Sequence, residues 1–234
     1  MFSSVRPFPF RFVQSWLGAG LSLFAVTHSV AAFAKETPST LFELAGAHPV
    51  AARLSQAVLV IIDAQRTYEK GPLALPGADS AVREIAVLLA RARAFHVPII
   101  HVLHEGTPGS GIFDPRDGSA RPIAALTPAA GEPIVVKHLP NAFAGTTLEK
   151  ALERIGRKDL IVVGFMTHMC VSSTVRAALD RGYRCTIVSG GCATRDLSDG
   201  HGGVVAAAVV QRVELAALAD RFAVVVDGPA DIGD

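Results

Sequence analysis

Short apolar runs alternate along the chain with longer stretches in which apolar residues recur every three or four positions. The runs have the length and β-branched content of buried strands, and they lie at 57–62, 98–103, 133–136, 160–164, 183–189 and 222–226. The periodic stretches have the spacing of helices, and they lie at 79–95, 146–155, 170–181 and 202–220. Strands that alternate with helices predict right-handed βαβ units. We therefore predict one α/β domain, a three-layer sandwich with helices on both faces of a parallel sheet.

Local signals mark two helix ends and one long loop. Thr146, with Glu149 three residues later, predicts a capping box at the start of the second helix. Gly182 follows the third helix, where a glycine readily takes the conformation that ends a helix. The segment 105–132 is rich in Gly and Pro and has no period. Because loops of this length inside a compact domain are usually functional, we expect a lid or a substrate-selecting segment there.

The N-terminal stretch has the features of an export signal. Arg6 and Arg11 supply positive charge, an apolar run covers 17–34, and Ala32 and Ala34 form the small-x-small pattern that a signal peptidase accepts. We predict a signal peptide at 1–34, a polar spacer at 35–56 and the folded domain at 57–234. An exported, periplasmic protein follows from this interpretation. The alternatives are an uncleaved anchor, or a cytoplasmic protein whose start codon is placed too far upstream.

Composition narrows the class of partner. The 22 Lys and Arg residues nearly balance the 21 Asp and Glu residues, and no basic stripe is present. This balance argues against nucleic acid or an anionic membrane surface as the main partner, and it favours a small molecule. The chain has three cysteines, an odd number. At ~3.3 Å per residue along a strand, Cys185 and Cys192 lie roughly 20 Å apart, so we expect free thiols.

Three polar residues follow predicted strands, and together they suggest a chemistry. Asp63 follows the first strand, Lys137 the third, and Cys170 comes after the fourth at a helix start. In open α/β sheets, reactive sites lie beyond the carboxyl ends of the strands. A helix N-terminus and a nearby ammonium group stabilise a thiolate. Asp63 is then placed to take the thiol proton and return it to a leaving amine, and N–H groups of the turn 165–170 are natural donors to an oxyanion.

Around these residues the chain resembles the isochorismatase-like cysteine hydrolases. The resemblance covers 57–226, and three sets of residues carry it: Asp63 with Gln65, Lys137 with the segment 141–148, and the turn Gly164-Phe165-Met166-Thr167 with Cys170-Val171. It implies a six-stranded parallel sheet of order 3-2-1-4-5-6 and an Asp63–Lys137–Cys170 triad. It also implies a cis peptide at Phe165–Met166 and oxyanion donors at Met166 and Cys170. Members of the family commonly form dimers or tetramers, so a homo-oligomer is expected.

Departures from the family pattern narrow the reaction. Nicotinamidases of this family carry an Asp-x-His metal motif after the first catalytic Asp, and no such motif follows Asp63. We therefore predict no metal and no cofactor. Isochorismatases proper lack the cysteine and cleave a vinyl ether, so Cys170 favours amide, ureido or lactam substrates. Vinyl-ether hydrolysis, and a non-catalytic ligand-binding role on the same fold, stay open as alternatives. The residues Ser189 to Thr194 stand where the family often has Asp-Ala, so that rim of the pocket differs.

Several further residues are candidates for the substrate pocket. His101 and His104 lie three apart on one predicted strand and point to opposite faces, so they cannot readily share a metal. Of the two, His104 is the pocket candidate, whereas His101 is expected to be packed. Arg195 and Asp196 either bind a substrate carboxylate or pair with each other. The complete set of predicted pocket residues is Gln65, His104, Phe143, Phe165 and His168.

Overall fold

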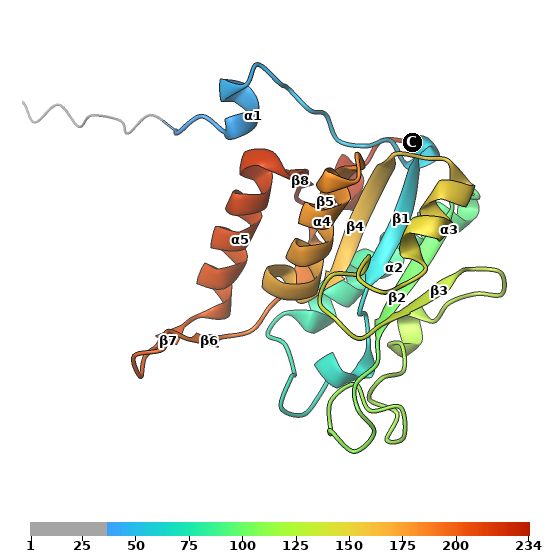
Figure 1. Ribbon diagram of the computed structural model, residues 1–234, viewed down its shortest axis with the longest axis vertical. Helices are drawn as coiled ribbons and strands as arrows, with labels where there is room; N and C mark the ends of the chain where they lie inside the picture. Colours follow the sequence, from blue (N-terminus) through green and yellow to red (C-terminus); the bar gives the residue numbers. More distant parts are fainter. Residues whose placement is uncertain (1–36) are drawn as a thin grey trace, which may run out of the picture. The chain divides into compact units, whose positions relative to one another are not determined.

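The computed structural model describes residues 37–234, which are built around a six-stranded sheet (Figure 1). The strands lie in the order β3-β2-β1-β4-β5-β8, and each neighbouring pair is parallel. Their bounds are Ala57–Ile62 (β1), Ile99–His104 (β2), Ile134–Lys137 (β3), Asp159–Phe165 (β4), Arg184–Ala193 (β5) and Ala223–Val226 (β8). The predicted fold class and strand order are therefore confirmed.

Helices cover both faces of the sheet, because alternate residues of the buried strands point to opposite sides. Leu59 and Ile61 of β1 pack with Ile85 of α2 on one face. Val58 and Val60 pack on the other face with residues of three further helices. The long helices are Ala78–Ala94 (α2), Leu148–Ile155 (α3), Ser172–Asp180 (α4) and Ala207–Arg221 (α5). Every residue of β1 is buried, which explains why this strand is an uninterrupted apolar run in the sequence.

Short helical turns complete the chain between these elements. The 3₁₀ turns are Leu54–Gln56, Arg66–Tyr68, Ala124–Leu126 and Pro229–Asp231, and a π-helical turn spans Thr167–Val171. The segment expected to be a polar spacer contains the short helix α1, Leu41–Leu44. It also contributes Ala52 and Leu54 to the core. The predicted signal peptide, 1–34, lies outside the described residues. Within 37–234 no helix has the length and apolar character to cross a membrane.

The structure corrects two predicted helix starts. α3 begins at Leu148, after Thr147, and Thr146 forms no capping box. Instead, its hydroxyl donates to the carbonyl of Ala142 and accepts from the N–H of Leu148. α5 begins at Ala207 and not at 202, because the preceding residues turn through a small antiparallel hairpin.

That hairpin pairs Leu197–Ser198 (β6) with Val204–Val205 (β7). The Asp199 carboxylate accepts hydrogen bonds from the N–H groups of His201 and Gly203 at 2.8 and 2.9 Å. Such side-chain bonds compete with a helix for the same backbone donors.

β1 and β4 lie in close contact at Gly164. This residue pairs with Ile62 and has a φ of +120°. A Cβ atom at this position would lie 1.9 Å from the carbonyl oxygen of Ile62, so only glycine fits. The close approach fixes the last residues of both strands, directly before Asp63 and the turn that carries Cys170.

Candidate active site

Asp63, Lys137 and Cys170 lie together at the carboxyl end of the sheet. Asp63 directly follows β1, Lys137 is the last residue of β3, and Cys170 stands in the turn after β4. Asp63 and Lys137 are fully buried, and Cys170 is 4% exposed. The carboxyl ends of parallel strands meet at one edge, and this brings side chains from distant parts of the sequence into one cluster.

The ammonium group of Lys137 is the centre of this cluster. Its Nζ lies 2.7 Å from Oδ2 of Asp63, 3.0 Å from Nδ1 of His104 and 3.2 Å from Sγ of Cys170. A protonated lysine has three N–H donors, and three acceptor atoms surround its Nζ here. Lys137 therefore holds the carboxylate, the imidazole and the thiol in a fixed arrangement.

Burial sets the protonation of the cluster. Loss of water raises the pKa of the Asp63 carboxyl, and the charge of Lys137 acts in the opposite sense. Burial and then the charge of Asp63 raise the pKa of the Cys170 thiol to about 12, against the attraction of Lys137. The sequence suggested a thiolate stabilised by Lys137 and a helix start, but desolvation outweighs both effects. Desolvation therefore disfavours the thiolate of Cys170, and we expect its attack on a carbonyl to use a base.

The turn around Cys170 has an unusual backbone. The π-helical turn Thr167–Val171 contains Cys170 and precedes α4. The peptide bond between Phe165 and Met166 is cis, as the resemblance implied. The carbonyl of Met166 accepts a hydrogen bond of 3.3 Å from the N–H of Val171, which closes the turn. The N–H groups of Met166 and Cys170 stay the predicted oxyanion donors.

Two predicted pocket residues, His104 and Gln65, contact the cluster or its neighbours. Burial, and then the charge of Lys137, lower the pKa of His104 to about 4, so its neutral ring accepts from the ammonium group. The side-chain amide of Gln65 donates to the carbonyls of His104 and Ala120 and accepts from the N–H of His104. Gln65 thus ties the end of β2 to the 105–132 loop, and a direct contact with substrate stays a prediction.

Phe165 and His168 lie beside the nucleophile. Phe165 is fully buried at the end of β4 and contacts the ring of Tyr68 edge to face, with centroids 5.5 Å apart. Nδ1 of His168 is hydrogen-bonded to the Thr194 hydroxyl, just after β5. Nε2 of the same ring is buried without a hydrogen-bond partner among the described residues. The pocket roles of Phe165 and His168 stay predictions.

Phe143 packs at a different place. Its ring stacks on Tyr183 with centroids 6.0 Å apart, and the guanidinium of Arg181 lies 4.8 Å from its centre. Tyr183 directly precedes β5, at the amino end of that strand. These contacts account for the burial of Phe143 as part of the core, and its predicted role in the pocket stays a prediction.

Arg195 and Asp196 do not form an ion pair with each other. The guanidinium of Arg195 donates to the main-chain carbonyl of Asp196. The Asp196 carboxylate instead accepts a 2.7 Å hydrogen bond from the N–H of Ala207, the first residue of α5. Asp196 thus stabilises a helix start, and the guanidinium of Arg195 keeps the capacity to bind an anion.

Sequence analysis missed two aromatic residues at the site, Tyr68 and Phe113. Phe113 belongs to the 105–132 loop, and its ring contacts both Tyr68 and His104, with centroids 5.4 and 4.6 Å apart. Tyr68 lies in the 3₁₀ turn after Asp63 and is 1% exposed. An aromatic residue so soon after a catalytic candidate was a signal available in the sequence. The position of Phe113 was not, because it depends on how the loop folds back.

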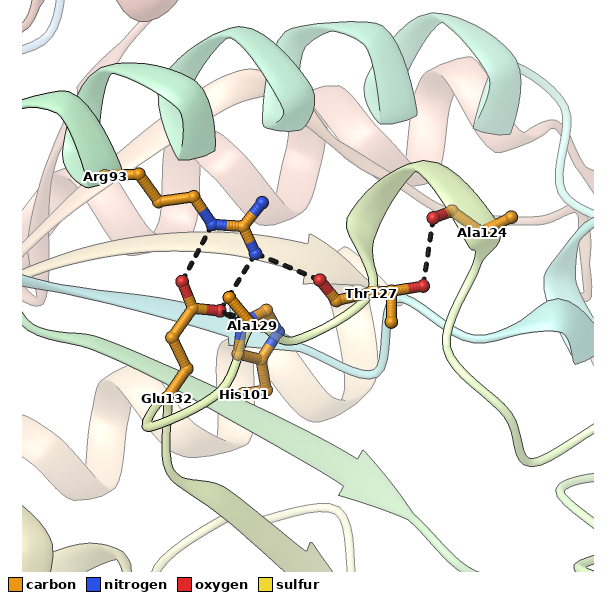
Figure 2. Close-up of polar contacts among 6 residues, drawn as sticks. All are labelled: Arg93, His101, Ala124, Thr127, Ala129 and Glu132. Atoms are coloured by element: carbon orange, nitrogen blue, oxygen red, sulfur yellow. Dashed lines mark hydrogen bonds and ion pairs between the residues drawn. The ribbon is translucent and has the colours of Figure 1, made fainter.

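His101 is buried and belongs to a separate, partly buried network, whose contacts Figure 2 shows. Its Nε2 lies 2.8 Å from the Glu132 carboxylate, which also binds the guanidinium of Arg93 at 2.8 and 2.9 Å. The N–H of Ala129 donates to the same carboxylate, and Arg93 also donates to the carbonyl of Thr127. We name Arg93, His101 and Glu132 the loop anchor, since they fasten the end of the 105–132 loop to α2 and β2. His101 is packed, as expected.

Asp63, His104 and Cys170 also have the donor atoms of a metal site. One ligand atom from each lies within 4.8 Å of the others. The ammonium group of Lys137 is in contact with all three, so a cation bound there would meet a resident positive charge. The arrangement fits proton transfer within the cluster better than metal binding.

Comparison with known proteins places this site in a family. The isochorismatase domain matches residues 57–228. The secreted isochorismatase effector Isc1 of Verticillium dahliae is 38% identical over 188 residues, 80% of this chain and 96% of that relative. The crystal structure of an isochorismatase from Pseudomonas putida KT2440 is 48% identical with a TM-score of 0.81, covering 84% of this chain and 100% of the other. Maleamate amidohydrolase of Pseudomonas putida is 30% identical over 161 residues, 61% of this chain and 74% of the relative.

The match covers most of the described residues, and the relatives include hydrolases by name. The resemblance stated from the sequence is confirmed, and an enzyme is favoured over a binding protein. This chain belongs to the isochorismatase family and is a hydrolase.

Proposed function

We propose that the chain is a cysteine amidohydrolase that cleaves a C–N bond of a small amide, ureide or lactam through a thioester on Cys170. The observation that carries this proposal is the buried contact of Lys137 with both Asp63 and Cys170. A thiol, a carboxylate and a fixed ammonium group within one closed cluster are the components of nucleophilic acyl transfer.

The first half of the reaction acylates the enzyme. Cys170 attacks the carbonyl carbon while its proton passes to Asp63, because the thiol is protonated at rest. The N–H groups of Met166 and Cys170 stabilise the oxyanion that forms. Asp63 then gives its proton to the leaving nitrogen, the C–N bond breaks, and the acyl group stays on sulfur as a thioester. A carboxyl whose pKa is raised suits a group that both takes and returns a proton.

The second half releases the acid. A water molecule loses a proton to Asp63 and attacks the thioester carbonyl, and the C–S bond breaks when that proton returns to the sulfur. Lys137 stays charged throughout and keeps the reacting groups in place. Phe113 supports a covering role for the 105–132 loop, because it packs on both Tyr68 and His104 beside the cluster.

A matched pair of cysteine variants tests the proposal. A panel of carboxamides, ureides and lactams is incubated with the protein, and both ammonia release and the intact mass are followed. With an amide that is turned over, we expect Cys170→Ala to abolish hydrolysis and the acyl adduct. Cys192→Ala, which also removes a buried thiol near a strand end, should keep both.

Retention of amide hydrolysis by Cys170→Ala would contradict the proposal. If that variant instead hydrolysed isochorismate at the wild-type rate, the vinyl-ether reaction would be favoured. An acyl adduct on Cys170 that appears in wild type and is absent from Asp63→Asn would support the assigned proton transfer.

We propose in addition that the chain is exported to the periplasm as a homo-oligomer after removal of residues 1–34, leaving 35–56 and the domain 57–234. The basic, apolar and Ala-x-Ala features of the N-terminus support this, and one relative is a secreted protein by name. Fractionation of a Gram-negative host followed by intact-mass analysis should find a protein that begins at Lys35 in the periplasm. Full-length protein in the cytoplasm would contradict export, and a monomer by light scattering would contradict the oligomer.

A further inference from the structure

Tyr68 is held rigidly at the edge of the candidate active site. Its ring makes edge-to-face contacts with Phe113 and with Phe165, at interplanar angles of 80° and 73°. Phe165 directly precedes Met166, a predicted oxyanion donor, and Phe113 also packs on His104. Two rigid aromatic neighbours fix where the phenol ring can lie. The Tyr68 ring is therefore fixed between Phe113 and Phe165, two residues that adjoin the candidate active site.

Among residues 37–234, the hydroxyl of Tyr68 is buried and forms no hydrogen bond. Burial first, and then the charge of Asp63, raise the pKa of Tyr68, so the hydroxyl keeps its proton and can donate. A buried hydroxyl without a hydrogen bond is unfavourable, and a phenylalanine would fill the same space without that cost. A bound molecule with an acceptor atom can therefore take the hydrogen bond that this O–H offers.

We propose that Tyr68 is a specificity-determining residue, whose hydroxyl donates a hydrogen bond to an oxygen on the carbon next to the scissile carbonyl of the substrate. This inference rests on the proposed function and names its substrate class, amides with an α-oxygen on the acyl side. In the tetrahedral intermediate the nitrogen faces Asp63, and the oxyanion faces the N–H groups of Met166 and Cys170. The acyl group is the substituent left to face Tyr68.

Two aldehydes that mimic the acyl group provide the test, because they add to a thiol but have no leaving group. Lactaldehyde and isobutyraldehyde differ by a hydroxyl and a methyl group on the same carbon. The thiol of Cys170 adds across the C=O bond to form a hemithioacetal, with the C–S bond formed and the proton transferred to oxygen. Binding is measured as protection of Cys170 from iodoacetamide, located by peptide mass. The readout is the ratio of the two dissociation constants in each protein.

We expect Tyr68→Phe to reduce the preference for lactaldehyde about 5-fold relative to wild type, the size of one lost hydrogen bond. Tyr183→Phe, which alters the other tyrosine of the chain, should leave the ratio unchanged. The thermal midpoint of Tyr68→Phe should not fall, because the removed hydroxyl makes no hydrogen bond to any of the described residues.

Comparison of the two ratios cancels the intrinsic difference in hydration between the aldehydes. If both aldehydes protect Cys170 and Tyr68→Phe leaves the ratio unchanged, this inference is overturned and the proposed function stands. If neither aldehyde protects Cys170 in wild type, the nucleophile assignment fails, and this inference fails with it.

Discussion

Strand β2 carries two histidines that belong to two ionic clusters of opposite character, one buried and one partly exposed. His104 contacts Lys137 in the candidate active site, and His101 contacts Glu132 in the loop anchor. In the loop anchor the Glu132 carboxylate accepts from Arg93, from His101 and from a backbone N–H (Figure 2). In the active site the polar atoms face one another, and the Tyr68 hydroxyl beside them forms no hydrogen bond within residues 37–234.

The two clusters differ in how they shift the pKa of their carboxyl groups, Glu132 and Asp63. Bonds from Arg93, opposed by partial burial, lower the pKa of Glu132 to about 2. Burial raises the pKa of Asp63 in spite of Lys137. A carboxylate that is fully hydrogen-bonded is stabilised as a charge and contributes to stability, whereas a buried carboxylate with few partners is ready to take a proton. The carboxylate of the loop anchor thus has a structural role, whereas the carboxylate of the active site is suited to chemistry.

The largest expected effect is on catalysis, from Asp63→Asn. Loss of the base that takes the thiol proton should reduce kcat/KM by about 10³-fold. The corresponding change in the loop anchor, Glu132→Gln, should leave kcat/KM within about 3-fold of wild type, since small effects are expected away from the reacting groups. Both are measured as ammonia release from an amide that the wild type hydrolyses. A loss below tenfold in Asp63→Asn would remove the distinction between the clusters.

Glu132→Gln should instead reduce the free energy of unfolding by about 3 kcal/mol. The amide cannot match the charge of Arg93, and it leaves donors of Arg93 and His101 without an acceptor. Urea unfolding, followed by circular dichroism, measures the change. Arg184→Gln provides the control, because its ion pair with Asp159 lies at the surface and should contribute less than about 1 kcal/mol. Equal losses in the two variants would show that the loop anchor is not a stabilising element.

The contribution of Glu132 should also depend on pH. Its pKa in the folded protein, about 2, is below the ordinary value of 4.5, so its stabilisation is present above pH 4.5 and is lost as the pH falls toward 2. Between pH 6 and pH 3, wild type should therefore lose about 2 kcal/mol more stability than Glu132→Gln. Urea unfolding of both proteins at the two pH values isolates this group from the other carboxylates. Parallel losses would mean that Glu132 is not the group that titrates.

The smallest effect concerns the thiol itself. Because the charge of Asp63 raises the pKa of Cys170, its removal in Asp63→Asn should lower that pKa and increase the thiolate fraction at pH 8. We expect iodoacetamide to modify Cys170 about tenfold faster in this variant, although the variant has lost hydrolysis. Intact-mass kinetics over pH 6–10 measure the rate. A rate that falls or stays constant would contradict the assigned interaction between the two residues.

Much of the fold and the central cluster followed from the sequence, for identifiable reasons. β1 is buried on both faces, so its apolar run was visible without knowledge of its neighbours. Asp63 and Lys137 could be placed together because parallel strands end at one edge. The prediction of a helix start was wrong where a side chain accepts hydrogen bonds from the local backbone, as the Asp199 carboxylate does before α5.

The aromatic part of the site could not be derived in the same way. Phe113 reaches Tyr68 because the 105–132 loop is tied down by distant groups, such as the Gln65 amide on the carbonyl of Ala120. Bonds of this kind join residues far apart in the chain and leave no periodic pattern. The protonation of Cys170 also depends on its final burial, which no local motif reports.

Gly164 sets a limit on how this protein can change. Ile62 stands so close to it that any side chain would force β1 and β4 apart. The residues that follow these strands would then separate, so the damage would reach Asp63 and Cys170 without touching either. In random mutagenesis, a substitution at this codon would be scored as a loss of activity, although position 164 has no chemistry of its own. Directed evolution toward new substrates should therefore vary residues of the loops around the site and keep the contact between Gly164 and Ile62.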